Sequence, residues 1–302
     1  MSASDTQGRN TIADVARMHA DGQRIAVVTA YDHPTAELAD EAGIPVILVG
    51  DSVAQVLLGY ETTVRISLEE MLHHTRAVVR GSKRALVVAD MPFLTYGVSL
   101  EDSLTNAGTF LRDAGAQAVK VEGGVRMAKT IEALTKAGIP VMAHIGLTPQ
   151  AIHQFGRFRV QGKTRESARA LLADAIAVQE AGAFSIVLEL VPEQLAAAIT
   201  ERLSIPTIGI GAGAGCAGQV QVVTDLLGLG SFKPKHARRY ADLRGTILGA
   251  LSAYRADVEA GTFPGPEETV RMDETVLEDA LGRGAPDRAD GPIAGIPLDR
   301  DL

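Results

Sequence analysis

The fold class follows from one stretch of the sequence, Ile44-Pro45-Val46-Ile47-Leu48-Val49-Gly50-Asp51-Ser52. Four consecutive branched apolar residues with no polar alternation predict a strand that is buried on both faces, as in a parallel sheet covered by helices. An aspartate follows the strand directly. In α/β sheets and barrels, active sites and ligand-binding sites lie at the carboxyl ends of the parallel strands, so this end of the strand is a candidate site.

The phrase that leads into this strand recurs along the chain. A charged residue, then Ala-Gly, then an apolar strand begins at Glu41, Asp113, Lys136 and Glu180. Each copy predicts a helix that ends at a glycine and a buried strand that follows it. Strands without this lead-in are predicted at 24–30, 84–89, 204–210 and, as the eighth, 227–232.

Amphipathic or capped segments predict helices between these strands, among them 11–20, 32–43, 67–80, 100–114 and 164–181. Seven or eight β-α repeats over about 250 residues predict a single (β/α)8 TIM barrel. A doubly wound sheet is the alternative. Such a sheet usually has fewer strands, and polar residues would not be expected so evenly at the ends of its successive strands.

We expect three regions along the chain. Residues 1–10 are predicted to be a disordered leader and residues 11–264 a TIM-barrel catalytic domain with an N-terminal helix. Residues 265–302 are rich in proline, glycine and charge, which predicts a partly disordered, flexible C-terminal tail with a short helix over 267–281.

Composition restricts the class of partner. The net charge is −8 and no basic stripe is present, which argues against nucleic acid or an anionic membrane surface. No run approaches the ~18 apolar residues that a membrane span needs. Cys216 is the single cysteine, so no intramolecular disulfide can form, as expected for a cytoplasmic protein.

Ionisable residues stand at five successive strand ends. In chain order they are Asp51, Asp90, Lys120, Glu122, His144 and Glu189. A lone carboxylate at a strand end is most often a helix cap or a loop anchor. Several ionisable groups around one rim of a barrel are better explained by a shared polar site, because such groups cluster at functional sites.

The residue types indicate metal-assisted chemistry on a 2-oxo acid. Asp51, Asp90 and Glu122 offer oxygen alone, which suits Mg²⁺. A 2-oxo acid can chelate this ion through its carboxylate and keto oxygen, and the ion then polarises the carbonyl and stabilises an enolate. Glu189 is the candidate base, and Lys120 is a candidate holder of the substrate carboxylate or of developing negative charge.

Four other features have two interpretations each. His144 is either a hydrogen-bond donor to substrate or a core histidine bonded to backbone. Gly213-x-Gly215-x-x-Gly218 matches the dinucleotide fingerprint only weakly, because no acid follows about 20 residues on. Cys216 is predicted to be a buried small residue rather than a nucleophile. The connection 145–164, with Arg157, Arg159 and Lys163, is either a solvated loop or a functional segment, acting as a lid or as a contact for an acidic ligand.

Several longer motifs occur in a fixed order. They are Val49–Ser52, Asp90–Phe93, Val119–Gly124, Ala143–Gln150 and Ile208–Gly213, with Thr29–Asp32 and Gln219-Val220. Together they resemble the ketopantoate hydroxymethyltransferase family over residues 11–264. The resemblance implies a TIM barrel assembled as a homodecamer, a pentamer of dimers. It implies transfer of a hydroxymethyl group from 5,10-methylenetetrahydrofolate to 3-methyl-2-oxobutanoate, giving 2-dehydropantoate in pantothenate (coenzyme A precursor) biosynthesis.

By motif position, the resemblance also implies roles for the strand-end residues. Asp51 and Asp90 are implied as ligands of one Mg²⁺ per subunit, with Glu122 as a further ligand or a residue behind them. The implied substrate contacts are Asp51, Ser52, Asp90 and Lys120. The implied catalytic residues are Glu189 as the proton-abstracting base, Lys120, and His144 beside them.

Two other functions stay open. A Mg²⁺-dependent lyase or mutase of 2-oxo acids, like the isocitrate lyase group, shares this barrel, although that group's Lys-Lys-Cys-Gly loop is absent from the sequence. A non-enzymatic keto-acid binder on the same scaffold would be expected to have lost a strand-end carboxylate, and every one is present.

Overall fold

The computed structural model describes residues 8–282. Our expectations for residues 1–7 of the leader and for residues 283–302 of the tail lie outside this range. Described residues up to Arg244 form one compact unit, and those from Gly245 onward form a second.

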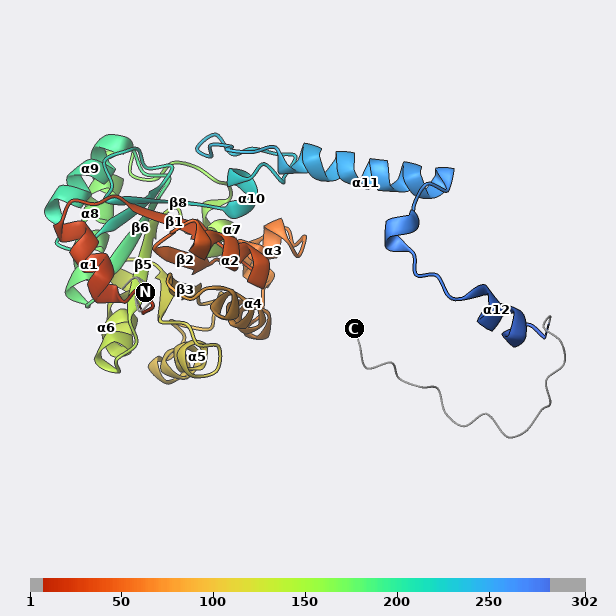
Figure 1. Ribbon diagram of the computed structural model, residues 1–302. Helices are drawn as coiled ribbons and strands as arrows, with labels where there is room; N and C mark the ends of the chain where they lie inside the picture. Colours follow the sequence, from red (N-terminus) through yellow and green to blue (C-terminus); the bar gives the residue numbers. More distant parts are fainter. Residues whose placement is uncertain (1–7, 283–302) are drawn as a thin grey trace. The chain divides into compact units, whose positions relative to one another are not determined.

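Eight parallel strands close into a barrel in chain order, with the last strand pairing with the first (Figure 1). The strands are β1 (Ile25–Thr29), β2 (Val46–Val49), β3 (Leu86–Asp90), β4 (Ala118–Glu122), β5 (Val141–Gly146), β6 (Ser185–Glu189), β7 (Thr207–Ile210) and β8 (Gly218–Gln221). The predicted (β/α)8 barrel is therefore confirmed.

The predicted position of the eighth strand is wrong. Residues 227–232 form no strand, and β8 instead spans Gly218–Gln221. This strand reads Gly-Gln-Val-Gln, so it carries one apolar residue and little of the pattern that marks a buried strand. It forms a strand because its backbone pairs with both neighbouring strands, β7 and β1.

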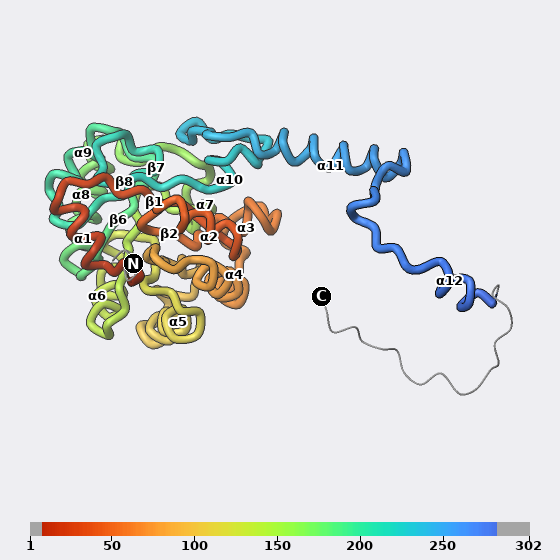
Figure 2. The backbone as a smooth tube through the Cα atoms, viewed as in Figure 1, coloured from red at the N-terminus to blue at the C-terminus, as the bar shows by residue number. Residues whose placement is uncertain are grey.

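Most of the helices surround the barrel (Figures 1 and 2), whereas the last two lie almost wholly in the second unit. The helices are α1 (Ile12–Ala20), α2 (His33–Glu41), α3 (Val53–Val56), α4 (Leu68–Gly81), α5 (Leu100–Arg112), α6 (Ala128–Lys136), α7 (Ile152–Phe155), α8 (Arg165–Glu180), α9 (Glu193–Arg202), α10 (Val223–Leu226), α11 (Leu243–Ala260) and α12 (Glu274–Ala280). Short 3₁₀ turns are η1 (Thr63–Arg65), η2 (Val125–Met127), η3 (Pro149–Ala151) and η4 (Pro266–Glu268). No helix among the described residues combines the length and hydropathy needed to cross a membrane.

Side-chain caps explain where the larger helices begin. The side chains of Asp32, Ser67, Ser99 and Thr164 each accept a hydrogen bond from a backbone amide in the first turn of the following helix. Such caps satisfy donors that the first turn leaves unpaired. The sequence thus sets where these four helices leave the rim of the barrel.

Alternation along the strands divides the core into two layers. Residues inside the barrel are Ile25, Val27, Val46, Leu48, Leu86, Val88, Ala118, Met142, Val187, Ile208 and Val220, with Val15 of α1 packed against them. Residues of opposite parity, such as Val119 and Val121, pack against the surrounding helices. The same alternation continues to the carboxyl ends of the strands, so Asp90, Lys120 and Glu122 are interior residues.

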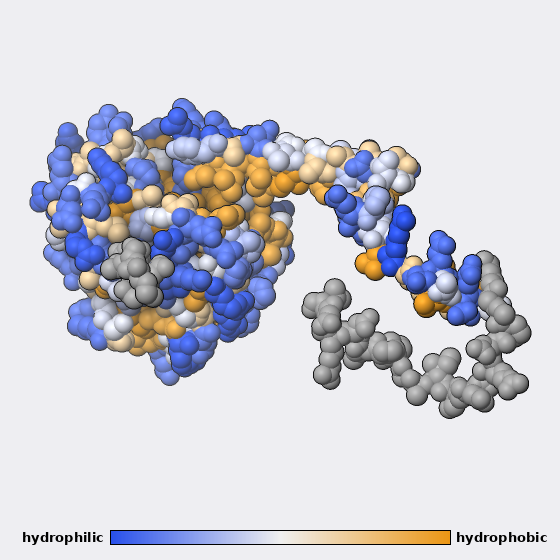
Figure 3. Space-filling model, viewed as in Figure 1, coloured by the Kyte–Doolittle hydropathy of each residue, from blue (hydrophilic) through white to orange (hydrophobic). Residues whose placement is uncertain are grey.

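Helix α11 carries an exposed apolar stripe. Ile247, Leu251, Tyr254 and Val258 recur at helical spacing and are 39%, 61%, 56% and 47% exposed. Figure 3 shows apolar side chains along this helix. Within its own unit, this helix therefore leaves an apolar face exposed.

Candidate active site

The strand-end residues predicted from sequence meet at the carboxyl-terminal end of the barrel. Five of the six ionisable side chains are buried, namely Asp51, Asp90, Lys120, Glu122 and His144, and Glu189 is partly buried. Register explains the meeting, because Asp90 pairs with Lys120 across β3 and β4, and Glu122 pairs with His144 across β4 and β5. Parallel strands in register bring their carboxyl ends to one rim.

Asp90 lies at the centre of one half of the cluster. Its Oδ1 is 3.2 Å from Lys120 Nζ, and its Oδ2 accepts a hydrogen bond of 2.9 Å from the backbone amide of Asp51. Gly50 leaves room for the neighbouring Ser52, because a Cβ at residue 50 would meet Ser52 Oγ at 2.7 Å. The β2 and β3 carboxylates are thereby held side by side.

His144 connects this half to the predicted base. Its Nδ1 lies 3.1 Å from Lys120 Nζ and 3.4 Å from Glu122 Oε1, and its Nε2 lies 3.2 Å from Glu189 Oε2. Burial and the nearby Lys120 ammonium lower the pKa of His144, which favours the neutral ring. If Nδ1 accepts from the ammonium, Nε2 carries the proton and faces Glu189. These contacts favour the site residue over the core histidine bonded to backbone.

Two residues that sequence reasoning missed hold the carboxylates in place. Gln150 Nε2 donates to Asp51 Oδ2 and to the Met91 carbonyl, both at 2.9 Å, and its backbone amide donates to Glu122 Oε2 at 3.0 Å. Tyr96 Oη donates to Gln150 Oε1 at 2.7 Å and accepts from the Glu122 amide at 3.0 Å. Both residues lie in loops beyond strand ends. Gln150 ends the motif Ala143–Gln150, whereas Tyr96 lies outside Asp90–Phe93 and gave no signal in the sequence.

Ser52 lies at the edge of the cluster. It directly follows Asp51 at the start of α3, is partly exposed, and its Oγ is 2.8 Å from Tyr31 Oη. Tyr31 is buried, and burial raises the pKa of its hydroxyl above the usual value. Ser52 is therefore accessible to a small ligand while a neutral phenol fixes its hydroxyl.

The electrostatics of the cluster are those of excess buried negative charge. Burial, with the charges of Asp90 and Glu122, raises the pKa of Asp51 well above its usual value. Burial likewise raises the pKa of Glu122 to about 7, although the Lys120 ammonium opposes this. Burial disfavours the ammonium, but the three carboxylates outweigh it and raise the pKa of Lys120.

These residues fit a divalent cation bound by few protein ligands. Asp90 Oδ1 and Glu122 Oε1 are buried and accept no hydrogen bond from any described residue. A cation would use these lone pairs and offset the negative charge. Within residues 8–282, no three His, Cys, Asp or Glu side chains are arranged to hold an ion by themselves. One or two carboxylates, completed by water and substrate oxygens, is the pattern typical of Mg²⁺.

Two adjoining cavities open beside this cluster. The inner cavity, of about 340 Å³, is lined by Glu122 and Gln150 and by Phe93, Tyr96 and Met127. The outer cavity, of about 680 Å³, is lined by residues that include Arg126, Arg159, Thr148 and Asp174. Arg126, Ala151 and Gln154 border both cavities.

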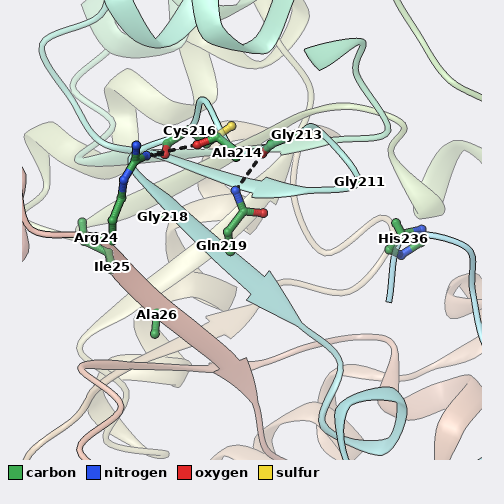
Figure 4. Close-up of a pocket in the computed structure, with 10 residues that line it drawn as sticks. All are labelled: Arg24, Ile25, Ala26, Gly211, Gly213, Ala214, Cys216, Gly218, Gln219 and His236. Carbon is green, nitrogen blue, oxygen red and sulfur yellow. Dashed lines mark hydrogen bonds between the residues drawn. The ribbon is translucent and has the colours of Figure 1, made fainter. Parts of the chain in front are cut away.

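A third cavity, of about 600 Å³, lies beside β1, β8 and the glycine-rich connection between β7 and β8 (Figure 4). Gln219 Nε2 donates to the Gly213 carbonyl at 2.8 Å, and Arg24 donates to the carbonyls of Ala214 and Cys216. Gly218 begins a strand, so the glycine run lacks the helix N-terminus that dinucleotide binding requires. Cys216 is 1% exposed and burial raises its pKa, as expected for a packing residue.

Comparisons with known proteins agree on one family. Residues 9–266 match the family described as ketopantoate hydroxymethyltransferase. A 3-methyl-2-oxobutanoate hydroxymethyltransferase from Chloroflexus aurantiacus is 62% identical over 275 residues, which cover 91% of this chain and 97% of that protein. One from Dehalococcoides mccartyi is 55% identical over 272 residues, covering 90% of this chain and 98% of that protein.

Solved structures share the fold at low identity. The phosphoenolpyruvate phosphomutase of Streptomyces platensis subsp. rosaceus has a TM-score of 0.57 at 17% identity, covering 91% of this chain and 96% of that chain. A phosphonopyruvate hydrolase has a TM-score of 0.57 at 14% identity, covering 91% and 97%. Both structures support the barrel fold. The reaction has to be argued from the residues of the site.

Proposed function

The chain belongs to the ketopantoate hydroxymethyltransferase family and is a transferase, and from this premise we propose its reaction, metal and residue roles. The reaction is transfer of a hydroxymethyl group from 5,10-methylenetetrahydrofolate to 3-methyl-2-oxobutanoate, giving 2-dehydropantoate in pantothenate biosynthesis. The observation that carries the proposal is the position of Glu189, a partly buried carboxylate that faces His144 across from the Asp51 and Asp90 carboxylates.

Asp51 and Asp90 are the proposed ligands of one Mg²⁺ per subunit, with Glu122 as a further ligand or as a residue behind them. Asp90 Oδ1 and Glu122 Oε1, which accept no hydrogen bond from a described residue, support this assignment. When bound, the ion supplies positive charge that polarises the keto oxygen and stabilises an enolate. The chain itself supplies fixed geometry, because Gln150 holds one oxygen of Asp51 and one of Glu122.

Lys120 holds the negative charge of the keto acid in this proposal. Its ammonium lies among three carboxylates, so it stays protonated, and it is 3.2 Å from Asp90 Oδ1. Its burial strengthens its attraction for a second anion, because few waters screen it. Asp51, Ser52 and Asp90 line the same end of the barrel and complete the substrate contacts.

Glu189 removes the proton from C3 of the keto acid, and the electron pair of the C–H bond stays on the substrate as the enolate. C3 then forms a bond to the one-carbon unit of the donor, whose carbon–nitrogen bonds break. Water supplies the hydroxyl group, and tetrahydrofolate leaves. His144, whose Nε2 lies 3.2 Å from Glu189 Oε2, orients this carboxylate.

The catalytic domain and assembly belong to the same proposal. Residues 11–264 form the catalytic domain, close to the family match at 9–266. A homodecamer, built as a pentamer of dimers, would provide a partner for the exposed apolar stripe of α11. We place the protein in the cytoplasm, with which its single cysteine is compatible.

The test is incubation of the protein with 3-methyl-2-oxobutanoate, Mg²⁺ and 5,10-methylenetetrahydrofolate, with 2-dehydropantoate measured by mass spectrometry. We expect product that depends on all three components. An Asp90→Asn variant serves as the matched control, because it keeps the side-chain volume and removes the charge. Absence of product under conditions in which a curated relative is active would refute the proposed reaction.

A further inference from the structure

We propose that the two adjoining cavities beside the β4 and β5 rim bind the folate donor. The inner cavity takes the ring system, and Arg126 and Arg159 of the outer cavity bind the glutamyl carboxylates. This inference rests on the proposed function, which names the donor, and it adds where the donor lies and which side chains hold its tail.

The inner cavity suits a flat heteroaromatic ring. Phe93, Tyr96 and Met127 form its walls, and Phe93 is 40% exposed although it adjoins the site. Aromatic faces and a thioether pack well against such a ring. The next residue, Leu94, is 62% exposed and has a φ of 61°, a conformation that side chains with a Cβ rarely adopt. The chain thus stores strain to hold an apolar edge at this cavity.

The inner cavity also reaches the reacting groups. Glu122 and Gln150 line it, and these residues contact His144 and Asp51 respectively. The one-carbon unit of the donor sits on its ring system and must approach C3 of the keto acid. A donor whose ring lies in the inner cavity meets this requirement from the Glu122 and Gln150 side of the cluster.

The outer cavity suits carboxylates. Neither the Arg126 nor the Arg159 guanidinium makes a hydrogen bond or ion pair with a described residue, although the charge of Arg126 acts to lower the pKa of the nearby Glu122. The one acid of this wall, Asp174, packs against Gly124 and accepts a hydrogen bond of 2.8 Å from the Val125 amide. Its charge is therefore directed at backbone, while two guanidinium groups remain available for bidentate contacts with an anion.

The order of the two cavities matches the order of groups in the donor. Arg126, Ala151 and Gln154 border both cavities, so an extended ligand passes Arg126 on its way outward. The reverse orientation would place the tail carboxylates against the Glu122 carboxylate. The third cavity of Figure 4 offers no such site, because Arg24, its one guanidinium, already donates to the carbonyls of Ala214 and Cys216.

The experiment compares two donors in the Arg126→Gln, Arg159→Gln and double variants. One donor is 5,10-methylenetetrahydrofolate, and the other is 5,10-methylenetetrahydropteroate, which lacks the glutamate. We expect each single variant to raise KM for the glutamylated donor about 5- to 10-fold, the size of a charge-assisted hydrogen bond weakened by exposure. The double variant should show about the product of the two effects.

Two controls separate this inference from folding and from the proposed reaction. Arg202→Gln removes the same charge from an exposed residue at the end of α9, on the opposite side of the barrel from the rim. Hydrogen exchange at C3 of 3-methyl-2-oxobutanoate needs no folate, so it should stay at the wild-type rate in all variants. KM for the pteroate donor should also stay unchanged.

Three outcomes would contradict the proposed donor site or the proposed reaction. An unchanged KM for the glutamylated donor in both single variants would overturn the inference while leaving the reaction intact. An equal rise in KM for both donors would overturn the assignment of the arginines to the tail. Wild-type protein that exchanges the C3 hydrogen but forms no product with either donor would refute the proposed reaction, and this inference with it.

Discussion

Replacing Gln150 with leucine tests whether its side-chain amide positions the Asp51 carboxylate for metal binding. Leucine keeps much of the side-chain volume but removes the amide that donates to Asp51 Oδ2 and to the Met91 carbonyl. It also removes the acceptor for Tyr96 Oη. The backbone hydrogen bond from residue 150 to Glu122 remains, so the change acts chiefly on Asp51.

The size of the effect follows from these contacts. A hydrogen bond to a charged group contributes about 1.5–3 kcal/mol. Since about 1.4 kcal/mol is a factor of ten, we expect Mg²⁺ affinity in the presence of the keto acid to fall about 10- to 100-fold. The Met91 carbonyl and the Tyr96 hydroxyl lose partners too, so the free energy of unfolding should fall by about 2–3 kcal/mol.

A matched control separates loss of stability from loss of metal binding. Gln117 accepts a hydrogen bond from the Val87 amide and donates to the Gly115 carbonyl, next to the amino-terminal end of β4. Gln117→Leu should lower stability without changing Mg²⁺ affinity. Mg²⁺ titration by calorimetry with 3-methyl-2-oxobutanoate present, and urea unfolding, measure the two effects.

Two results would refute the reasoning about Gln150. One is an unchanged Mg²⁺ affinity in Gln150→Leu, which would mean that the amide does not position Asp51. The other is an equal loss of affinity in Gln117→Leu, which would mean that general destabilisation explains the effect.

Three other predictions concern single residues. Glu189→Gln should slow C3 hydrogen exchange, followed by NMR in D₂O, by about 10²–10⁴-fold while Mg²⁺ binding survives; exchange at the wild-type rate would exclude Glu189 as the base. Asp90→Ala should weaken keto-acid-dependent Mg²⁺ binding at least about tenfold, and an unaltered titration would contradict its role as a ligand. Burial opposes ionisation of Asp40, but hydrogen bonds from the Ala85 and Arg84 amides outweigh burial and lower the pKa of Asp40. The ionised side chain therefore stabilises the fold above the ordinary carboxyl pKa, and this contribution is lost as pH falls through the lowered pKa. Asp40→Asn should therefore cost about 1 kcal/mol at pH 7 and progressively less as the pH falls below the ordinary carboxyl pKa, in urea unfolding over this pH range.

The sequence by itself determined the barrel and most of its polar rim. Apolar runs such as 46–49 and the repeated Ala-Gly phrase predict strands and helix ends, because both signals come from residues close together in the chain. The two-residue period of a strand then places Lys120 and Glu122 on one face. Because carboxyl ends of parallel strands share a rim, Asp51, Asp90 and Glu189 could be expected there before any coordinates.

Tertiary structure decided what depends on contacts between distant segments. β8 is a strand because barrel closure pairs its two edges, although its own residues carry little strand pattern. Gln150 and Tyr96 become partners of Asp51 and Glu122 only when two loops fold over the rim. Whether Arg159 was a solvated loop residue or bordered a cavity was likewise open, because sequence spacing does not fix where a loop returns to the barrel.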